Sequence, residues 1–91
     1  MITLNVFVRV NETNREKAIE AAKELTACSL KEEGCIAYDT FESSTRRDVF
    51  MICETWQNAE VLAAHEKSSH FSKYVGIIQE LAEMKLEKFE F

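Results

Sequence analysis

The sequence predicts an α+β domain in which the secondary-structure elements follow the order β-α-β-β-α-β. Three observations carry this prediction: strict alternation over residues 2–10, an alanine-rich stretch with helical spacing, and two apolar segments joined by a short polar connection. The chain has 91 residues, no proline, no internal repeat and no linker-like segment, so we expect residues 1–91 to form a single domain.

The first strand and the first helix have clear periodic patterns. In residues 2–10 the apolar residues fall on one face, namely Ile2, Leu4, Val6, Val8 and Val10. Thr13 with Glu16 three positions later matches a capping box, which predicts that a helix begins there. Helical spacing then continues to about residue 30 through Ala18, Ala21, Ala22, Leu25 and Cys28. Gly34 is a natural stop after this helix.

Residues 35–42 and 49–56 read as two strands of a hairpin, because the connection SSTRRD is short and polar. Asn58 can cap a short helix over residues 58–66, and Ser68 or Ser69 can cap the next. That helix carries an apolar stripe of Phe71, Tyr74, Val75, Ile78, Leu81 and Ala82. The segment MKLEKFEF, residues 84–91, predicts a last strand with imperfect alternation.

This order is the ferredoxin-like split βαβ arrangement. Right-handed crossovers would place both helical regions on one face of a four-stranded antiparallel sheet. The uncovered face is also apolar, because the strand at 49–56 is apolar on both of its faces and the first strand adds Phe7. The two faces of that strand carry Val49, Met51 and Cys53 on one side and Phe50, Ile52 and Trp56 on the other. A contiguous apolar patch usually marks an interface, so we predict a homodimer that packs sheet against sheet.

Composition excludes several classes of function. The net charge is −5 and Arg46-Arg47 is the only adjacent basic pair, so we expect no nucleic-acid partner. No apolar run approaches the roughly 20 residues that span a bilayer, and the N-terminus does not resemble a signal peptide. We therefore expect a cytoplasmic protein without membrane contact. Two glycines cannot form a dinucleotide fingerprint or a P-loop, and we expect no cofactor.

Three cysteines without a C-x-x-C pair are expected to behave as small buried hydrophobic residues. The segment HEKSSH, residues 65–70, holds both histidines of the chain. It resembles the zinc-protease signature H-E-x-x-H but has one residue too many. Five positions on a continuous helix leave two side chains roughly 140° apart, so we expect no metal site.

His65 follows Val61 and Leu62 at helical spacing and should point inward. It is a candidate acid or base, and the alternative is a core histidine satisfied by one hydrogen bond. His70 lies at a helix start beside Phe71, where it could instead be an ordinary surface histidine.

Four further residues are candidates for ligand contact. Glu54 shares a strand face with Trp56, and a carboxylate on an apolar face needs a partner or a raised pKa. It could line a pocket or bond across the dimer. Tyr38 and Asn5 are polar groups on predicted central strands. Each could contact a ligand, or could satisfy backbone or partner-chain groups.

Three segments carry a family resemblance: LKEEGCIAYDTFES, VFMICETW and VLAAHEKSSHF. They resemble the antibiotic biosynthesis monooxygenase family of dimeric α/β barrels, over nearly the whole chain. The most specific parts are the run E-G-C-x-x-Y/F from Glu33 to Tyr38, the run E-x-W from Glu54 to Trp56, and the run L-x-x-H-x-x-S-x-H-F from Leu62 to Phe71.

The resemblance implies a ferredoxin-like subunit, a homodimer formed by the sheets, and a pocket between sheet and helices that contains His65 and Trp56. Small members of the family oxidise quinols or polycyclic phenols with molecular oxygen and without flavin or metal. Relatives include an isomerase of a phosphorylated quorum-sensing signal. Other relatives degrade haem with an Asn-Trp-His set, but Val6 stands at the position of that asparagine, which argues against haem degradation here.

We therefore predict a cofactor-independent monooxygenase that oxidises a quinol or polycyclic phenol with molecular oxygen, with His65 as the base. The predicted substrate-binding residues are Asn5, Phe7, Tyr38, Glu54, Trp56, His70 and Phe71, and no metal ligands are expected. One alternative is an isomerase of a small phosphorylated or carbonyl substrate, with Arg9 or Lys73 as the cationic anchor. The other alternative is a small-molecule-binding dimer without catalytic activity.

Overall fold

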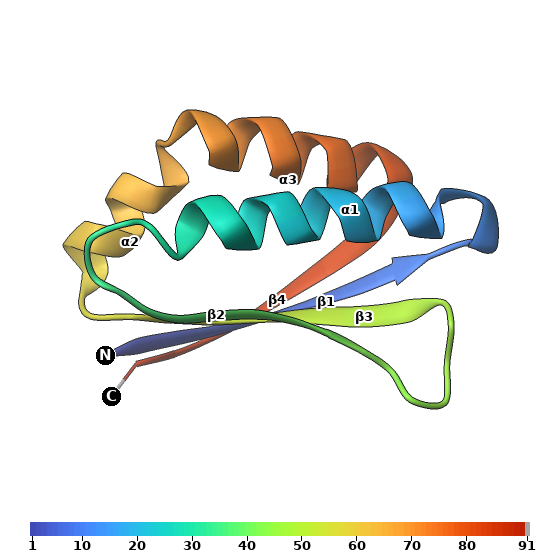
Figure 1. Ribbon diagram of the computed structural model, residues 1–91. Helices are drawn as coiled ribbons and strands as arrows, with labels where there is room; N and C mark the ends of the chain where they lie inside the picture. Colours follow the sequence, from blue (N-terminus) through green and yellow to red (C-terminus); the bar gives the residue numbers. More distant parts are fainter. Residues whose placement is uncertain (91) are drawn as a thin grey trace.

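The computed structural model describes residues 1–90 and confirms the predicted α+β fold, with the second helical region divided into two helices. The elements are β1 (Ile2–Val10), α1 (Glu12–Ser29), β2 (Cys35–Glu42), β3 (Val49–Trp56), α2 (Ala59–Glu66), α3 (Ser69–Leu81) and β4 (Ala82–Glu90). The antiparallel sheet has the strand order β2-β3-β1-β4, and α1 and α3 lie side by side over one of its faces (Figure 1). This is the ferredoxin-like arrangement.

The core lies between that face and the helices. Alternate residues of β1 and of β3 are buried there, as strand geometry requires. The buried hydrophobic side chains from the sheet are Ile2, Leu4, Val8, Val10, Tyr38, Phe50, Ile52 and Trp56, and α1 covers them with Ala18, Ile19, Ala21, Ala22 and Leu25. Glu54 is buried in the same β3 row, between Ile52 and Trp56.

The ends of two elements differ from the prediction. Helix α1 begins at Glu12, because the side chain of Asn11 accepts a hydrogen bond from the Asn14 N–H at 2.9 Å. The capping box at Thr13 was therefore a wrong start signal, and an earlier, equally good N-cap residue took its place. Ala82 is extended and pairs with Val10, so it begins β4 and does not extend α3. The predicted strand 84–91 starts two residues earlier, and position 91 lies outside the described residues.

A β-bulge at the start of β2 determines which face Tyr38 occupies. Cys35 pairs with Trp56, whereas Ala37 pairs with Thr55 and Tyr38 with Glu54, so the register shifts between Cys35 and Ala37. The extra residue, Ile36, moves Tyr38 onto the helix-covered face beside Glu54. Tyr38 is on an edge strand, not on a central strand as predicted.

The second face of the sheet has no helix over it (Figure 1). A row of side chains crosses this open face from Phe41 through Met51 and Phe7 to Lys85, according to the strand register. Phe7 is 39% exposed and Phe41 is 52% exposed. Among residues 1–90, no helix is long and apolar enough to cross a membrane.

Gly34 sits in the turn between α1 and β2, where the backbone adopts φ of +83°. This positive φ disfavours any residue with a side chain. A Cβ atom at this position would in addition lie 2.6 Å from Val61 of α2. Gly34 therefore allows this turn to approach α2 closely.

We predict that Gly34→Ala destabilises the fold by about 2–4 kcal/mol, the sum of left-handed backbone strain and overpacking against Val61. Gly76→Ala is the matched control, because nothing lies within 4 Å of a Cβ there and the residue is inside α3. That change should stabilise by about 0.5–1 kcal/mol. Urea denaturation measures both, and equal effects of the two variants would contradict the close-approach argument.

Candidate functional site

His65 is enclosed by aromatic rings. It lies in the last turn of α2, whose start is fixed by the N-cap Asn58, and its side chain is 1% exposed. The indole of Trp56 is 4.4 Å from the imidazole centroid at an interplanar angle of 35°. Tyr38 at 5.7 Å and Phe71 at 5.1 Å approach with T-shaped geometry. These contacts restrict the ring to one orientation.

Glu32 determines the tautomer of His65. The carboxylate oxygens of Glu32, in the turn after α1, lie 3.0 and 3.2 Å from His65 Nδ1. An ionised carboxylate can only accept, so Nδ1 carries the hydrogen, and neutral His65 presents a lone pair at Nε2. Nε2 is buried and has no hydrogen-bond partner in the described chain; Glu54 Oε1 is 4.0 Å away. His70 donates from its own Nε2 to Glu32 Oε1.

Glu54 and Tyr38 form the polar side of the site. The Trp56 indole N–H donates to Glu54 Oε1 at 2.8 Å. Burial raises the pKa of Glu54, an effect that the Trp56 hydrogen bond, the charge of His65 and the Tyr38 hydroxyl offset only in part. Burial, followed by the nearby charge of Glu54, also raises the pKa of Tyr38, so its hydroxyl stays protonated at neutral pH.

A cavity of about 280 Å³ opens between the sheet and the helices at this point. Its polar lining residues are Tyr38, Glu54, His65, Glu66 and Gln79. The remaining lining residues are apolar, namely Leu4, Val6, Leu25, Ile52, Leu62, Phe71, Val75, Met84 and Leu86. Nδ1 of His65 faces Glu32, which is outside this cavity, so Nε2 is the ring nitrogen on the cavity side. Among the described residues that line the cavity, none is Arg or Lys.

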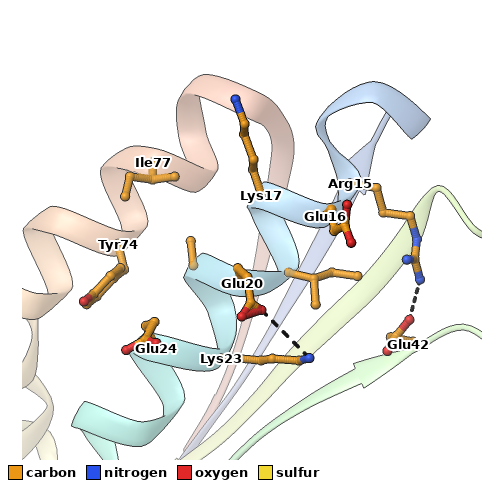
Figure 2. A pocket seen from close by; sticks show the side chains of 11 residues that line it. Arg15, Glu16, Lys17, Glu20, Lys23, Glu24, Glu42, Tyr74 and Ile77 are labelled. Carbon is orange, nitrogen blue, oxygen red and sulfur yellow. Dashed lines mark hydrogen bonds and ion pairs between the residues drawn. The ribbon is translucent and has the colours of Figure 1, made fainter.

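A larger hollow of about 810 Å³ lies on the outer surface along α1 and α3. Figure 2 shows charged side chains around it, with Lys23 paired to Glu20 and Arg15 paired to Glu42. It is an open groove between solvated charges. It offers no enclosed polar group comparable to His65, so we place the candidate site in the smaller cavity.

The structure brings together five of the predicted site residues, namely Tyr38, Glu54, Trp56, His65 and Phe71. His70 lies beyond Glu32 and does not line the cavity. Asn5 and Phe7 project from the open face of the sheet, because strand alternation turns them away from Leu4 and Val8. Asn5 Oδ1 accepts from the Cys53 thiol at 3.3 Å, and neither Asn5 nor Phe7 lines this cavity.

Sequence reasoning missed Glu32. It stands in a turn, in no catalytic motif, and the only signal for it was the need of an inward-facing histidine for an acceptor. The geometric reason for expecting no metal site also fails. The chain turns at Lys67 and Ser68 between α2 and α3, so the two imidazoles are not on one continuous helix and both reach the carboxylate of Glu32.

Comparisons with known proteins agree with this architecture. The model of the family described as antibiotic biosynthesis monooxygenase matches residues 1–76. YcnE of Bacillus subtilis, described as a candidate monooxygenase, is 30% identical over 87 residues, which cover 96% of this chain and 92% of YcnE. A conserved protein from Bacteroides thetaiotaomicron, described as a possible oxidoreductase, is 94% identical with a TM-score of 0.98, over 99% of this chain and 96% of that one.

A more distant structure, the N63A mutant of SnoaB from Streptomyces nogalater, is described as a cofactor-independent oxygenase. Its TM-score is 0.88 at 9% identity, over 99% of this chain and 91% of that chain. At this level of identity the similarity is one of fold alone.

We predict that Glu54→Gln stabilises the protein at pH 8, because Glu54 is a buried carboxyl whose pKa is raised by burial. The amide oxygen can still accept from Trp56, and the buried charge is removed. The raised pKa means that folded protein binds the proton more tightly, so the wild type loses stability as the pH rises through that pKa. The gain should vanish below the ordinary value of 4.5, where Glu54 is itself protonated.

Urea denaturation of both proteins at pH 4 and pH 8 measures the difference. Glu24→Gln, which changes an exposed carboxyl on α1 outside the cavity lining, is the matched control and should show no pH-dependent gain. A Glu54→Gln protein that is less stable than the wild type at pH 8 would mean that the Glu54 charge is itself stabilising.

Proposed function

Because the chain belongs to the antibiotic biosynthesis monooxygenase family, we propose that it oxidises a small phenolic or quinol substrate with molecular oxygen, using His65 as the base and no flavin or metal. The observation that carries the proposal is the buried, unpartnered Nε2 of His65 at the wall of an apolar cavity. The description of SnoaB as a cofactor-independent oxygenase adds support at the level of fold.

The first step is removal of the phenolic proton by His65 Nε2, which makes the substrate electron-rich enough to reduce oxygen. In the enol form of an anthrone, the phenolate passes one electron to O₂ and becomes an aryloxyl radical. This radical and superoxide then combine at the ring carbon para to the phenolic oxygen. The peroxide takes the proton back from His65. Loss of water then leaves a carbonyl that keeps one oxygen atom, so the substrate supplies all the electrons and no external reductant is needed.

The surroundings of Nε2 suit this role. Glu32 stabilises the imidazolium that forms, because its carboxylate accepts from Nδ1–H throughout. The apolar walls exclude water, and the protonated Tyr38 hydroxyl can donate to a substrate oxygen. At about 280 Å³ the cavity is just below the range for small-molecule sites, about 300–1,000 Å³, which favours compact aromatic substrates.

The isomerase alternative finds less support. A phosphorylated substrate needs a cationic anchor, and both candidate residues lie outside the cavity. Arg9 is exposed and pairs with Glu83 at 3.6 Å, and the Lys73 ammonium lies 5.1 Å from the ring centroid of Tyr74. A small-molecule-binding dimer without catalysis is the second alternative, and it predicts saturable binding without oxygen uptake.

The working unit in this proposal is a homodimer formed by the open faces of two sheets. The row Phe41, Met51 and Phe7 is apolar and contiguous across three strands, and no helix within residues 1–90 covers it. Two-fold packing of identical faces would bury it symmetrically.

We predict that the metal-stripped protein accelerates oxygen uptake by reduced naphthoquinols or anthrones above the protein-free autoxidation rate. His65→Asn should lower this acceleration by about 10²-fold or more, the contribution expected of a general base. An oxygen electrode measures the rate. Lys73→Ala, on the outer surface of α3, is the control and should keep the wild-type rate.

Acceleration that survives in His65→Asn would remove His65 from the chemistry while leaving the oxygenase intact. Absence of acceleration on every substrate, with ligand binding detected by calorimetry, would support the binding dimer instead.

The dimer generates a separate prediction. Phe7→Glu places a charge at the centre of the open face, where burial in the dimer would cost several kcal/mol, so the protein should sediment as a monomer at micromolar concentration. Leu30→Glu is the matched control, because Leu30 is 54% exposed at the end of α1, away from the sheet, and this variant should remain dimeric. A wild-type protein that sediments as a monomer contradicts the proposal.

A further inference from the structure

The side chains of Glu32, His65 and His70 come from three parts of the chain and meet on the Nδ1 side of His65, away from the cavity. Glu32 belongs to the turn after α1, His65 to the last turn of α2, and His70 to the first turn of α3. His65 Nδ1 and His70 Nε2 bond the same carboxylate, and one ligand atom from each of the three residues lies within 4.8 Å of the others. The turn at Lys67 and Ser68 is what brings the second imidazole here.

Two imidazoles and a carboxylate are a ligand set suited to Zn²⁺ and to other first-row divalent ions. Such bonds are about 2.0–2.2 Å long, which separates tetrahedral ligand atoms by about 3.3 Å. His65 Nδ1 is already 3.0 and 3.2 Å from the two Glu32 oxygens. The ligand atoms of the three residues lie within 4.8 Å of one another, so an ion that replaces the two ring hydrogens would need the less buried His70 to move until all of these separations approach about 3.3 Å.

The site is reachable from solvent. The side chains of Glu32 and His70 are 18% and 23% exposed, and both line an open groove of about 350 Å³. Glu33 and Glu60 stand on the same groove, so the potential at its rim is negative and favours a cation. Three protein ligands on the inner side leave the groove side open for water as the remaining ligand.

The other ring nitrogen of His65, Nε2, is also placed as expected for a metal-bound imidazole. A metal-bound imidazole usually donates its other N–H to a carboxylate. With an ion on Nδ1 the hydrogen must sit on Nε2, and the nearest carboxylate oxygen is Glu54 Oε1 at 4.0 Å. Glu54 is itself held by the Trp56 indole N–H. Nε2, which has no partner in the metal-free chain, would then gain one through a small movement.

We infer that Glu32, His65 and His70 form a binding site for a divalent transition-metal ion, with Zn²⁺ as the probe, and that occupation of this site reverses the tautomer of His65. Binding at Nδ1 puts the hydrogen on Nε2, which removes the lone pair from the cavity side. The ion and the base function of His65 therefore exclude each other, so the site is an inhibitory switch for any reaction that needs this base. The binding itself does not depend on the oxygenase proposal.

The test is calorimetric titration of the metal-stripped full chain with Zn²⁺, followed by the visible absorption of the Co²⁺-loaded protein. We expect one ion per subunit and Co²⁺ bands typical of nitrogen and oxygen ligands. Glu32→Gln and His70→Ala should each weaken Zn²⁺ binding at least tenfold. Long-range ¹H–¹⁵N spectra of the imidazoles should show the His65 hydrogen on Nδ1 without metal and on Nε2 with Zn²⁺.

Two controls isolate the site. Glu33→Gln removes a charge from the rim but no ligand, and should change Zn²⁺ affinity less than threefold. Cys35→Ser tests for capture by the nearby thiol, and should leave both affinity and the Co²⁺ spectrum unchanged. His70→Ala changes a partly exposed side chain, so it reports on binding even if Glu32→Gln folds poorly.

Wild-type protein that binds no Zn²⁺, or binds it as tightly after His70→Ala, overturns the inference. A thiolate charge-transfer band that disappears in Cys35→Ser would also overturn it. Zn²⁺ binding with a reversed tautomer, in a protein that takes up no oxygen, would support the site and reject only the oxygenase. Oxygen uptake without Zn²⁺ binding would support the oxygenase and reject the metal site.

Discussion

A buried imidazole can lie on an apolar helix face only if at least one of its nitrogens is satisfied, and in this domain that requirement is met by Glu32. The carboxylate has to come from the turn after α1, so that turn must press against α2. Gly34 permits the approach through its positive φ and its lack of a side chain. The same carboxylate accepts from His70, which ties the start of α3 to the other two segments. One acceptor thus connects three elements that are far apart in the sequence.

The periodic parts of the chain were predictable because local spacing decides them. The alternation of β1, the hairpin of β2 and β3, and the caps Asn58 and Ser68 all match the structure. The inward direction of His65 followed from its spacing to Leu62 in the same way. Three tertiary features could not be predicted from the sequence: the bulge at Ile36, the acceptor Glu32, and the convergence of both histidines on Glu32. Each of these depends on contacts between residues more than ten positions apart or on an irregular strand.

Asn5 and Phe7 show how strand alternation separates residues that a family resemblance groups in one site. Their alternation with Leu4 and Val8 placed them on the uncovered face from the start, yet family resemblance suggested pocket contacts. Strand geometry decides between the two, because neighbouring residues of a strand point to opposite faces of the sheet. Val6, by contrast, lines the cavity with an alkyl group where haem-degrading relatives have an amide. The walls of this cavity are therefore mostly apolar, and its buried polar groups are those of Tyr38, Glu54 and His65.

The bulge in β2 has a consequence for how this strand can change length over evolution. Ile36 is the surplus residue, since Cys35 and Tyr38 are already matched to Trp56 and Glu54 on β3. A lineage that lost Ile36 would straighten the strand and leave the phenol where it is. Loss of Ala37 with the bulge retained would instead move every later residue of β2 to the opposite face of the sheet, so the Tyr38 phenol would leave the cavity. Whether a relative keeps the bulge is thus more informative about its cavity than the number of residues between the glycine and the tyrosine.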